Sequence, residues 1–346
     1  MKPKAALAVL AVSLVVGTGC GGSGTESKRL NGGGSSFVNP MMTKWASVYE
    51  KAKGVQVNYQ SMGSGAGIQQ MIVKTIDFGC TDAPLNDEQL SKAKATGGEV
   101  VHIPLVMGAV VPIYNLEGVQ KPLQFTGSVL AGIYLQKIKK WNDPELAKLN
   151  PDVKLPDKDI LIVHRSEGSG TTYIWVDYLS KVSPEWKEKV GVGPSVNWPA
   201  GAGAKGNEGV AGKVANSPGG MGYVELIYAM QNNIRFGMVQ NREGEFVTPS
   251  LESVTAAAKG ALVNIPEDLR YSLTDAPGKD AFPISGTTWA VLYITQPAGK
   301  GQAVVDFLRW VTHEGQQYTK DLDYAHLPEE LVHRLEKKLD QVHIAQ

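Results

Sequence analysis

The stretch Leu161-Ile162-Val163-His164-Arg165-Ser166-Glu167-Gly168-Ser169-Gly170-Thr171-Thr172 decides the fold class. Its first three residues are apolar and predict a short strand, and the residues that follow Thr172, through Leu179, predict a helix. The glycines and serines between them predict a tight loop that leads from the strand into the helix. Strands that alternate with helices in this way are typical of α/β proteins.

The same order of strand, loop and helix recurs along the chain. The segment Ser61-Met62-Gly63-Ser64-Gly65-Ala66-Gly67 is a glycine-rich turn before a helical pattern, and Asn86 is suited to cap the start of a helix. We expect strands at 55–59, 102–114, 222–224 and 284–294, and helices at 41–51, 68–75, 208–215, 303–311 and 328–342. This alternation predicts an α/β fold with largely parallel sheets.

The composition is that of a folded protein without a dominant charge. The chain has 346 residues, of which 42% are hydrophobic and 20% charged, and its length suits two lobes of ordinary domain size. Lys plus Arg equals Asp plus Glu, 34 of each, so no net field favours nucleic acid or an anionic membrane. Local donors must therefore hold any anionic ligand.

The first nineteen residues (1–19) form a predicted signal peptide. Lys2 and Lys4 precede an apolar run of signal-peptide length, which is too short for a membrane span. The run ends at Cys20, which resembles the lipid-attachment cysteine of a bacterial lipoprotein, and residues 20–29 form a predicted flexible tether. A plain secretory signal with a chance cysteine is the alternative. A disulfide between Cys20 and Cys80, the only other cysteine, is also open.

Four short segments share a chemistry that suits a small oxyanion. Three place small hydroxyl residues among or after glycines near the start of an expected helix, where free N–H groups and the helix dipole favour negative charge. Arg165 adds a guanidinium that can bind two oxygens, although a surface ion pair with Glu167 is the simpler alternative. Each serine alone is more often a helix cap. The segments are Ser35-Ser36-Phe37, Gly63-Ser64-Gly65, Gly168-Ser169-Gly170-Thr171 and Thr81-Asp82.

Asp82 narrows the choice of anion. A carboxylate in an anion site repels a fully deprotonated ligand such as sulfate, but it can accept a hydrogen bond from an anion that still carries a proton. Phosphate near neutral pH keeps at least one O–H. An unpaired buried acceptor costs about 1–3 kcal/mol, and more when it is charged. Asp82 therefore favours phosphate, unless it only caps the turn before Ala83-Pro84.

An enzyme, such as a phosphatase, is the main rival. The sequence has no Gly-x-Ser-x-Gly elbow, no Walker sequence and no His-Glu-x-x-His metal motif. His164 adjoins Arg165 and could act as a base, but the end of a buried strand explains it better. The segment Gly201–Gly206 fits Gly-x-Gly-x-x-Gly, yet Trp198-Pro199 precedes it in place of an apolar strand. We predict no enzyme activity, cofactor or metal; a binding protein for another oxyanion is a second rival.

The oxyanion segments resemble, in order and spacing, the phosphate-binding proteins of phosphate ABC transporters. The resemblance implies a two-lobed fold with the anion between the lobes, and an exported protein in the periplasm or on the outer face of the cytoplasmic membrane. It runs from about residue 30 to the end and is carried by Gly32 to Phe37, Tyr59 to Gly67, Asp77 to Pro84 and Arg165 to Thr171. The site that it implies consists of Ser36, Phe37 (through its N–H), Ser64, Asp82, Arg165, Ser169, Gly170 (through its N–H) and Thr171.

The resemblance also implies lobe boundaries and partners. The first lobe comprises residues 30–104 and 282–346, and the second comprises residues 105–281. The expected partners are inorganic phosphate, the permease subunits of a phosphate ABC transporter and the membrane through a lipid at Cys20; we expect a monomer and no nucleic acid. One residue departs from the family, because Glu167 stands where an Asp usually pairs with the Arg.

Overall fold

The computed structural model describes residues 29–346. The predicted signal peptide, Cys20 and nearly all of the tether lie outside the described residues. The α-helices are α1 (Asn39–Lys53), α2 (Ser64–Ile72), α3 (Asp87–Gly97), α4 (Gly127–Tyr134), α5 (Pro144–Leu149), α6 (Gly170–Val182), α7 (Pro184–Lys189), α8 (Gly206–Ala215), α9 (Leu226–Gln231), α10 (Leu251–Ala261), α11 (Gly301–Thr312) and α12 (Glu329–Leu339), with 3-10 helices at η1 (Leu262–Asn264) and η2 (Glu314–Leu322).

The strands form one large sheet and two small ones. The large sheet has the order β2-β1-β3-β12-β4-β8-β6-β7, and β9 pairs with β4. The strands are β1 (Arg29–Gly34), β2 (Gln56–Ser61), β3 (Phe78–Thr81), β4 (Val100–Tyr114), β5 (Gln124–Phe125), β6 (Leu161–Arg165), β7 (Ala202–Ala204), β8 (Gly220–Glu225), β9 (Arg235–Phe236), β10 (Met238–Gln240), β11 (Phe246–Val247), β12 (Ser285–Tyr293), β13 (Thr295–Gln296) and β14 (His343–Ile344).

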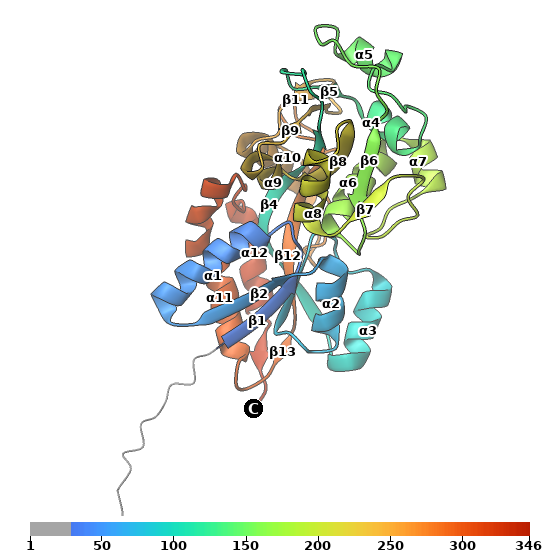
Figure 1. Ribbon diagram of the computed structural model, residues 1–346. Coiled ribbons are helices and arrows are strands. Elements are labelled where there is room, and N and C mark those ends of the chain that lie inside the picture. Colours follow the sequence, from blue (N-terminus) through green and yellow to red (C-terminus); the bar gives the residue numbers. More distant parts are fainter. Residues whose placement is uncertain (1–28) are drawn as a thin grey trace, which may run out of the picture.

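The large sheet contains two parallel sets joined by antiparallel strands. Strands β1, β2 and β3 are parallel to one another, and so are β6, β7 and β8. The two sets are connected through β12 and β4, which pair antiparallel. Figure 1 shows the resulting two lobes, with β4 and β12 running from one into the other. The predicted α/β class and two-lobed architecture are confirmed.

Strand β4 changes its partner where it passes between the lobes. Its residues up to Ala109 pair with β12, whereas its residues from Val110 onward pair with β8. The fifteen residues of β4 are almost all buried, because the strand lies in the core of both lobes. The continuous apolar run in the sequence therefore reflects a strand that has no solvent-exposed face.

Local signals in the sequence fix several helix ends. Asn86 caps α3 in a capping box, in which its side chain accepts from the Gln89 N–H and the Gln89 side chain accepts from the Asn86 N–H. Helix α1 carries Pro40 in its first turn and ends at Gly54, whose φ of 68° is the left-handed conformation that glycine adopts easily. Helix α2 begins at Ser64, earlier than the expected 68–75, because Gly63 supplies the turn before it with a φ of 88°.

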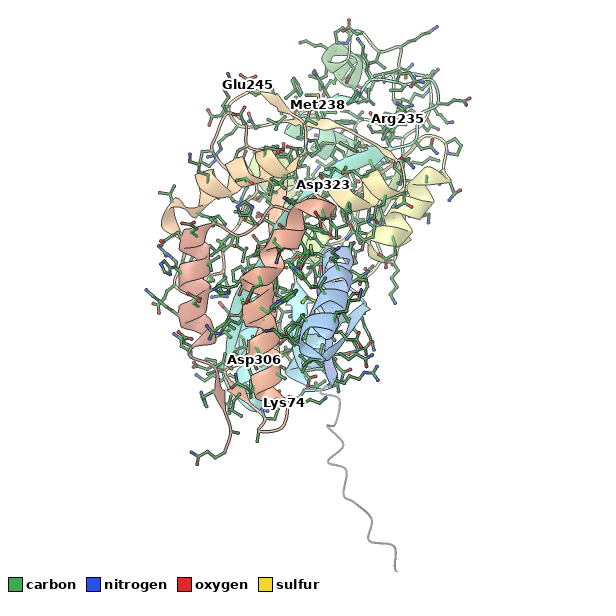
Figure 2. All side chains as sticks on the ribbon, turned by 90° about the vertical axis from the view of Figure 1, so that its left-hand side faces the viewer. Lys74, Arg235, Met238, Glu245, Asp306 and Asp323 are labelled. Atoms are coloured by element: carbon green, nitrogen blue, oxygen red, sulfur yellow. The ribbon has the colours of Figure 1, made fainter. Side chains whose placement is uncertain are left out.

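Helices cover both faces of the sheet in the first lobe. Helix α2 lies against β1 and β3, so closely that a Cβ on Gly67 would lie 2.3 Å from the Gly34 Cα. Helices α11 and α12 run side by side in Figure 2. Arg309 of α11 forms an ion pair of 2.8 Å with Asp340, which follows the last residue of α12. No helix in residues 29–346 has the length and apolar character needed to cross a membrane.

Candidate functional site

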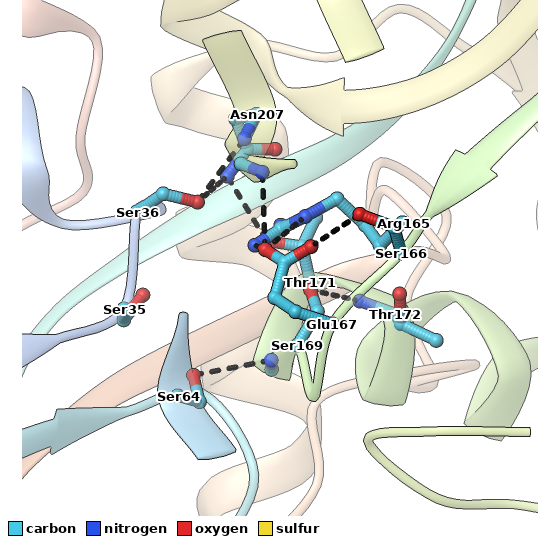
Figure 3. Close-up of polar contacts among 12 residues, drawn as sticks. Ser35, Ser36, Ser64, Arg165, Ser166, Glu167, Ser169, Thr171, Thr172 and Asn207 are labelled. Atoms are coloured by element: carbon cyan, nitrogen blue, oxygen red, sulfur yellow. Dashed lines mark hydrogen bonds and ion pairs between the residues drawn. The ribbon is translucent and has the colours of Figure 1, made fainter. Parts of the chain in front are cut away.

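The four segments singled out in the sequence meet between the two lobes. Figure 3 shows Ser36, Ser64 and Ser169 from three of them, and hydrogen bonds from Ser35 and to Ser64 place Asp82 of the fourth beside them. Each lies directly after a strand of one of the parallel sets, at or before the start of a helix, which is where α/β sheets bind ligands. All the predicted site residues are buried, and the side chains of those other than glycine are between 0% and 3% exposed. The first lobe supplies Ser36, Phe37, Ser64 and Asp82, and the second supplies Arg165, Ser169, Gly170 and Thr171.

The two lobes are in direct contact around these residues. The Gly65 N–H donates to the Gly168 carbonyl at 2.9 Å, and the Gly170 N–H donates to Ser64 Oγ at 3.1 Å. A Cβ on Gly170 would lie 2.5 Å from both the backbone nitrogen and Oδ2 of Asp82. Only glycine allows the start of α6 to approach Asp82 this closely. The structure is therefore a closed state in which the site has little access to solvent.

The four site hydroxyls accept hydrogen bonds from the protein but donate none. Ser36 Oγ accepts from Asn207, Ser64 Oγ accepts from Gly170, Ser169 Oγ accepts from the Thr172 N–H, and Thr171 Oγ1 accepts from Asn207. Within residues 29–346, no protein acceptor pairs with the O–H of any of these four groups. A hydroxyl carries one donor as well as its acceptor positions. Four donors are thus left free in a buried region.

Asp82 presents one free carboxylate oxygen to the same region. Its Oδ1 accepts from the hydroxyls of Ser35 and Thr288, each at 2.6 Å, whereas its Oδ2 has no hydrogen-bond partner within the described residues. Burial raises the pKa of Asp82 to about 6, although the hydroxyls of Ser35 and Thr288 and the charge of Arg165 oppose the shift. The free oxygen can accept a hydrogen bond from a group that carries a proton.

Arg165 presents one free nitrogen. Its Nε donates to Glu167 Oε1 at 2.9 Å, and its Nη2 also pairs with that oxygen, whereas its Nη1 has no partner in the described part of the chain. Glu167 Oε1 also accepts from the Gly206 N–H at 3.0 Å. Burial acts to raise the pKa of Glu167, but the bonds and charge of Arg165 outweigh it and lower that pKa. Glu167 is therefore ionised and fixes the guanidinium.

The two backbone N–H groups expected to face an anion donate within the protein here. The Phe37 N–H donates to Ser35 Oγ at 3.0 Å, and the Gly170 N–H donates to Ser64 Oγ at 3.1 Å. Both acceptors belong to residues of the predicted anion-binding segments. An N–H at a helix start can be shared between two nearby acceptors, so these bonds leave the expected roles of Phe37 and Gly170 open.

The segment from Ser35 to Phe37 is held by three tyrosines whose role was not predicted from the sequence. Tyr59 donates to the Ser35 carbonyl at 2.8 Å, Tyr228 to the Ser36 carbonyl at 2.6 Å, and Tyr324 to the Phe37 carbonyl at 2.6 Å. These bonds keep the three carbonyl oxygens paired and turn the segment so that its donors can face the site. Tyr59 lies on β2, Tyr228 on α9 and Tyr324 in the loop after η2, so no local pattern in the sequence indicated this shared role.

Comparison with known proteins places the chain in a family. Residues 21–314 match the PBP superfamily domain. A phosphate-binding protein PstS of Pasteurella multocida is 46% identical over 316 residues, which cover 90% of each chain. A protein of the same name from Xylella fastidiosa is 45% identical over 314 residues, which cover 90% of this chain and 85% of the relative. The chain belongs to the PstS family of phosphate-binding proteins.

A solved structure shows the same fold at low identity. A high-affinity periplasmic phosphate-binding protein, PfluDING, bound with phosphate, superposes with a TM-score of 0.73 at 19% identity, covering 89% of this chain and 93% of that chain. At this identity the likeness supports the fold alone. The two-lobed architecture of this PstS family member is thus shared with a protein that its sequence barely resembles.

Two other features of the sequence lie outside the predicted oxyanion donors of this PstS family member. His164 is half-buried on β6 and stacks on Trp198, with ring centroids 4.8 Å apart, as expected of a residue near a strand end. The segment Gly201–Gly206 forms β7 and the start of α8, and its Gly206 N–H donates to Glu167. Residues 29–346 contain no group of three His, Cys, Asp or Glu side chains that could hold a metal ion.

Proposed function

We propose that this chain binds inorganic phosphate between its two lobes and delivers it to a phosphate ABC importer. The single observation that carries the proposal is the free Oδ2 of Asp82, which lies buried among groups that are otherwise donors. The relatives of the chain are named phosphate-binding proteins, so their function agrees with this chemistry. As a member of a family of binding proteins, the chain is not an enzyme.

The donors to phosphate are divided between the lobes. Ser36, Ser64 and the Phe37 N–H donate from the first lobe, and Ser169, Thr171 and the Gly170 N–H donate from the second. Arg165 donates through Nη1, the nitrogen that Glu167 leaves free. Because the ligand's bonds are complete only when both lobes meet, phosphate favours the closed state.

Asp82 selects phosphate over sulfate in this proposal. Its Oδ2 accepts the remaining O–H of phosphate, whereas sulfate has no proton to donate and would face an unpaired negative charge. Such an unmet acceptor costs about 1–3 kcal/mol, and more when charged. A binding protein for sulfate would not place an acceptor without a partner at this position, so we favour phosphate over other oxyanions.

Glu167 replaces the usual Asp without losing contact with Arg165. The longer side chain bonds the guanidinium and the Gly206 N–H, and it also lies against the first lobe, since a Cβ on Gly63 would be 2.8 Å from the Glu167 Cγ. Gly63 therefore provides the space that Glu167 needs. We propose that Glu167 orients Arg165 and adds a contact between the lobes without touching phosphate.

We propose that the lobes comprise residues 30–104 with 282–346 and residues 105–281. The second boundary falls close to the start of β12, and the first lies within β4, a few residues before its partner changes from β12 to β8. Opening then bends or twists β4 and β12, which are the strands that pass between the lobes. Hinges of this kind absorb a domain motion in a few residues.

The chain is exported, as a member of a family of exported solute-binding proteins. We propose that it acts as a monomer in the periplasm or at the outer face of the cytoplasmic membrane, held there by a lipid on Cys20. The apolar leader and the glycine-rich tether support this proposal. Its proposed partners are the permease subunits of the importer, which receive the phosphate.

Calorimetric titration of residues 29–346 with phosphate, arsenate and sulfate tests the function. We expect one phosphate per chain and no measurable heat of binding from sulfate. Equal affinity for phosphate and sulfate would exclude the role of Asp82, and no binding of any of the three anions would exclude the proposed function.

A further inference from the structure

Asn207 is a fully buried residue in the second lobe that none of the predicted anion-binding segments contains. It lies in the first turn of α8, directly after Gly206, and its side chain is 0% exposed. Its backbone N–H and its Nδ2 donate to Ser36 Oγ at 3.1 and 2.9 Å, and its Nδ2 also donates to Thr171 Oγ1 at 3.1 Å. Asn207 therefore contacts a site hydroxyl from each lobe (Figure 3).

The amide of Asn207 has a fixed orientation. Its Oδ1 accepts from the Glu225 N–H at 3.0 Å, which requires the oxygen on the side of β8 and the NH₂ group on the side of the site. Rotating the amide by half a turn would place two donors opposite the Glu225 N–H and an acceptor opposite Ser36. The hydrogen-bond network thus assigns the NH₂ group to Ser36 and Thr171.

This orientation decides which way the two hydroxyls can donate. A serine hydroxyl has one donor and two acceptor positions. Ser36 Oγ accepts two N–H groups from Asn207, so both its acceptor positions are occupied and its remaining capacity is the O–H donor. Thr171 Oγ1 accepts from the same NH₂ group, which turns its O–H away from Asn207. Both hydroxyls are consequently left to donate into the site.

Asn207 also adds to the contact between the lobes. Ser36 follows β1 in the first lobe, whereas Asn207 follows β7 in the second. Tyr228 of α9 donates to the carbonyl of the same serine, so Ser36 is bound through both its side chain and its backbone. These bonds connect the position of the donor hydroxyl to closure of the lobes.

We propose that Asn207 is a positioning residue that orients the hydroxyls of Ser36 and Thr171 to donate to the anion, without contacting the anion itself. This inference rests on the proposed function, because it needs an anion that accepts from the two hydroxyls. A carboxylate at position 207 reverses the arrangement. It accepts the two O–H groups that the anion would otherwise receive.

The test measures the affinity for inorganic phosphate of N207D and N207A, each in the wild-type background and in S36A/T171V. N216D is the matched control, because Asn216 is an exposed asparagine at the end of the same helix. In the wild-type background we expect N207D to weaken phosphate binding by more than about 100-fold and N207A by about 10-fold, with N216D unchanged. In S36A/T171V, which lacks both hydroxyls, we expect N207A to weaken phosphate binding by less than about 2-fold.

The background comparison separates positioning from a purely structural role. A role in folding alone would give the same loss of affinity in both backgrounds, and that result would overturn the inference. Wild-type affinity in both N207D and N207A would also overturn it. If N207D does not fold, the affinities of N207A in the two backgrounds test the inference without it. Failure of the wild-type chain to bind phosphate would instead overturn the proposed function and this inference with it.

Discussion

Replacing Asp82 with Asn removes the charge of the proposed hydrogen-bond acceptor and keeps the shape of the side chain. The Oδ1 of D82N can still accept from Ser35 and Thr288, whose hydroxyls lie 2.6 Å from that atom in the wild-type protein. The amide NH₂ takes the place of Oδ2, the oxygen without a partner. The substitution therefore converts an acceptor that faces the site into a donor while the supporting contacts remain.

The expected effect on selectivity follows from two opposite changes. Phosphate loses a hydrogen bond to a charged acceptor, which contributes about 1.5–3 kcal/mol, or roughly a 10- to 150-fold loss of affinity. Sulfate no longer faces an unpaired buried charge, which in the wild-type protein weakens sulfate binding by at least about 1–3 kcal/mol. The ratio of the two affinities should therefore narrow by about two to four orders of magnitude.

The same substitution should stabilise the anion-free protein at neutral pH. The pKa of Asp82 is raised from 3.8 to about 6 by burial, so the folded state favours the protonated carboxyl by about 3 kcal/mol. That stability is fully present below about pH 4 and is lost as the pH rises through about 6. D82N mimics the neutral form, so its unfolding free energy should match that of the wild type near pH 4 and exceed it by about 3 kcal/mol above pH 7.

Two measurements decide whether this reasoning holds. Calorimetry at pH 8 compares phosphate and sulfate binding to the wild type, to D82N and to the control D157N, which alters an exposed aspartate. Denaturant unfolding from pH 4 to pH 8 compares the stabilities without anion. A wild-type ratio of affinities in D82N would refute the role of Asp82 as the acceptor. An unfolding difference that does not change with pH would refute the raised pKa.

Four further substitutions, one of them with a matched control, test other parts of the structure. R165A should weaken phosphate binding by at least about 30-fold in calorimetry, and E167A should weaken it by less, because only Arg165 has a nitrogen without a partner in the protein. Equal losses of affinity would mean that the pair acts as a unit. G170A should prevent closure, so phosphate should no longer reduce the radius of gyration in X-ray scattering, whereas G212A, whose Cβ would meet nothing within 4 Å, should still close. N86A removes a capping box and should lower the unfolding free energy by about 1 kcal/mol; an unchanged denaturation midpoint would contradict the cap.

The main elements of the fold could be predicted because each has a local signal. The buried strand β4 appears as an apolar run, and α12 appears as a regular helical pattern. Short elements such as β9 and β10 have only two or three residues, so their pairing depends on contacts with distant strands. The antiparallel passage through β4 and β12 was not predicted either, since strand direction follows from topology.

Most of the predicted site residues belong to a local chemical pattern of glycine and hydroxyl groups around a helix start, and Asp82 and Arg165 stand out by their charge beside it. The residues that support them had no such pattern. Thr288 is 206 positions from Asp82, and Asn207 is 171 positions from Ser36. A threonine in a buried strand and an asparagine in a helix are common for other reasons. Only the folded chain reveals that Thr288 bonds Asp82 and that Asn207 bonds Ser36.

The direct contact between the lobes has a kinetic consequence. At the proposed site, an anion bound by both lobes would leave only after the start of α6 separates from Asp82 and Ser64, because these parts are in direct contact in the closed state. The residence time of the ligand is then set by how often the protein opens. A transporter that separates the lobes would accelerate unloading without competing for a single oxygen of the cargo.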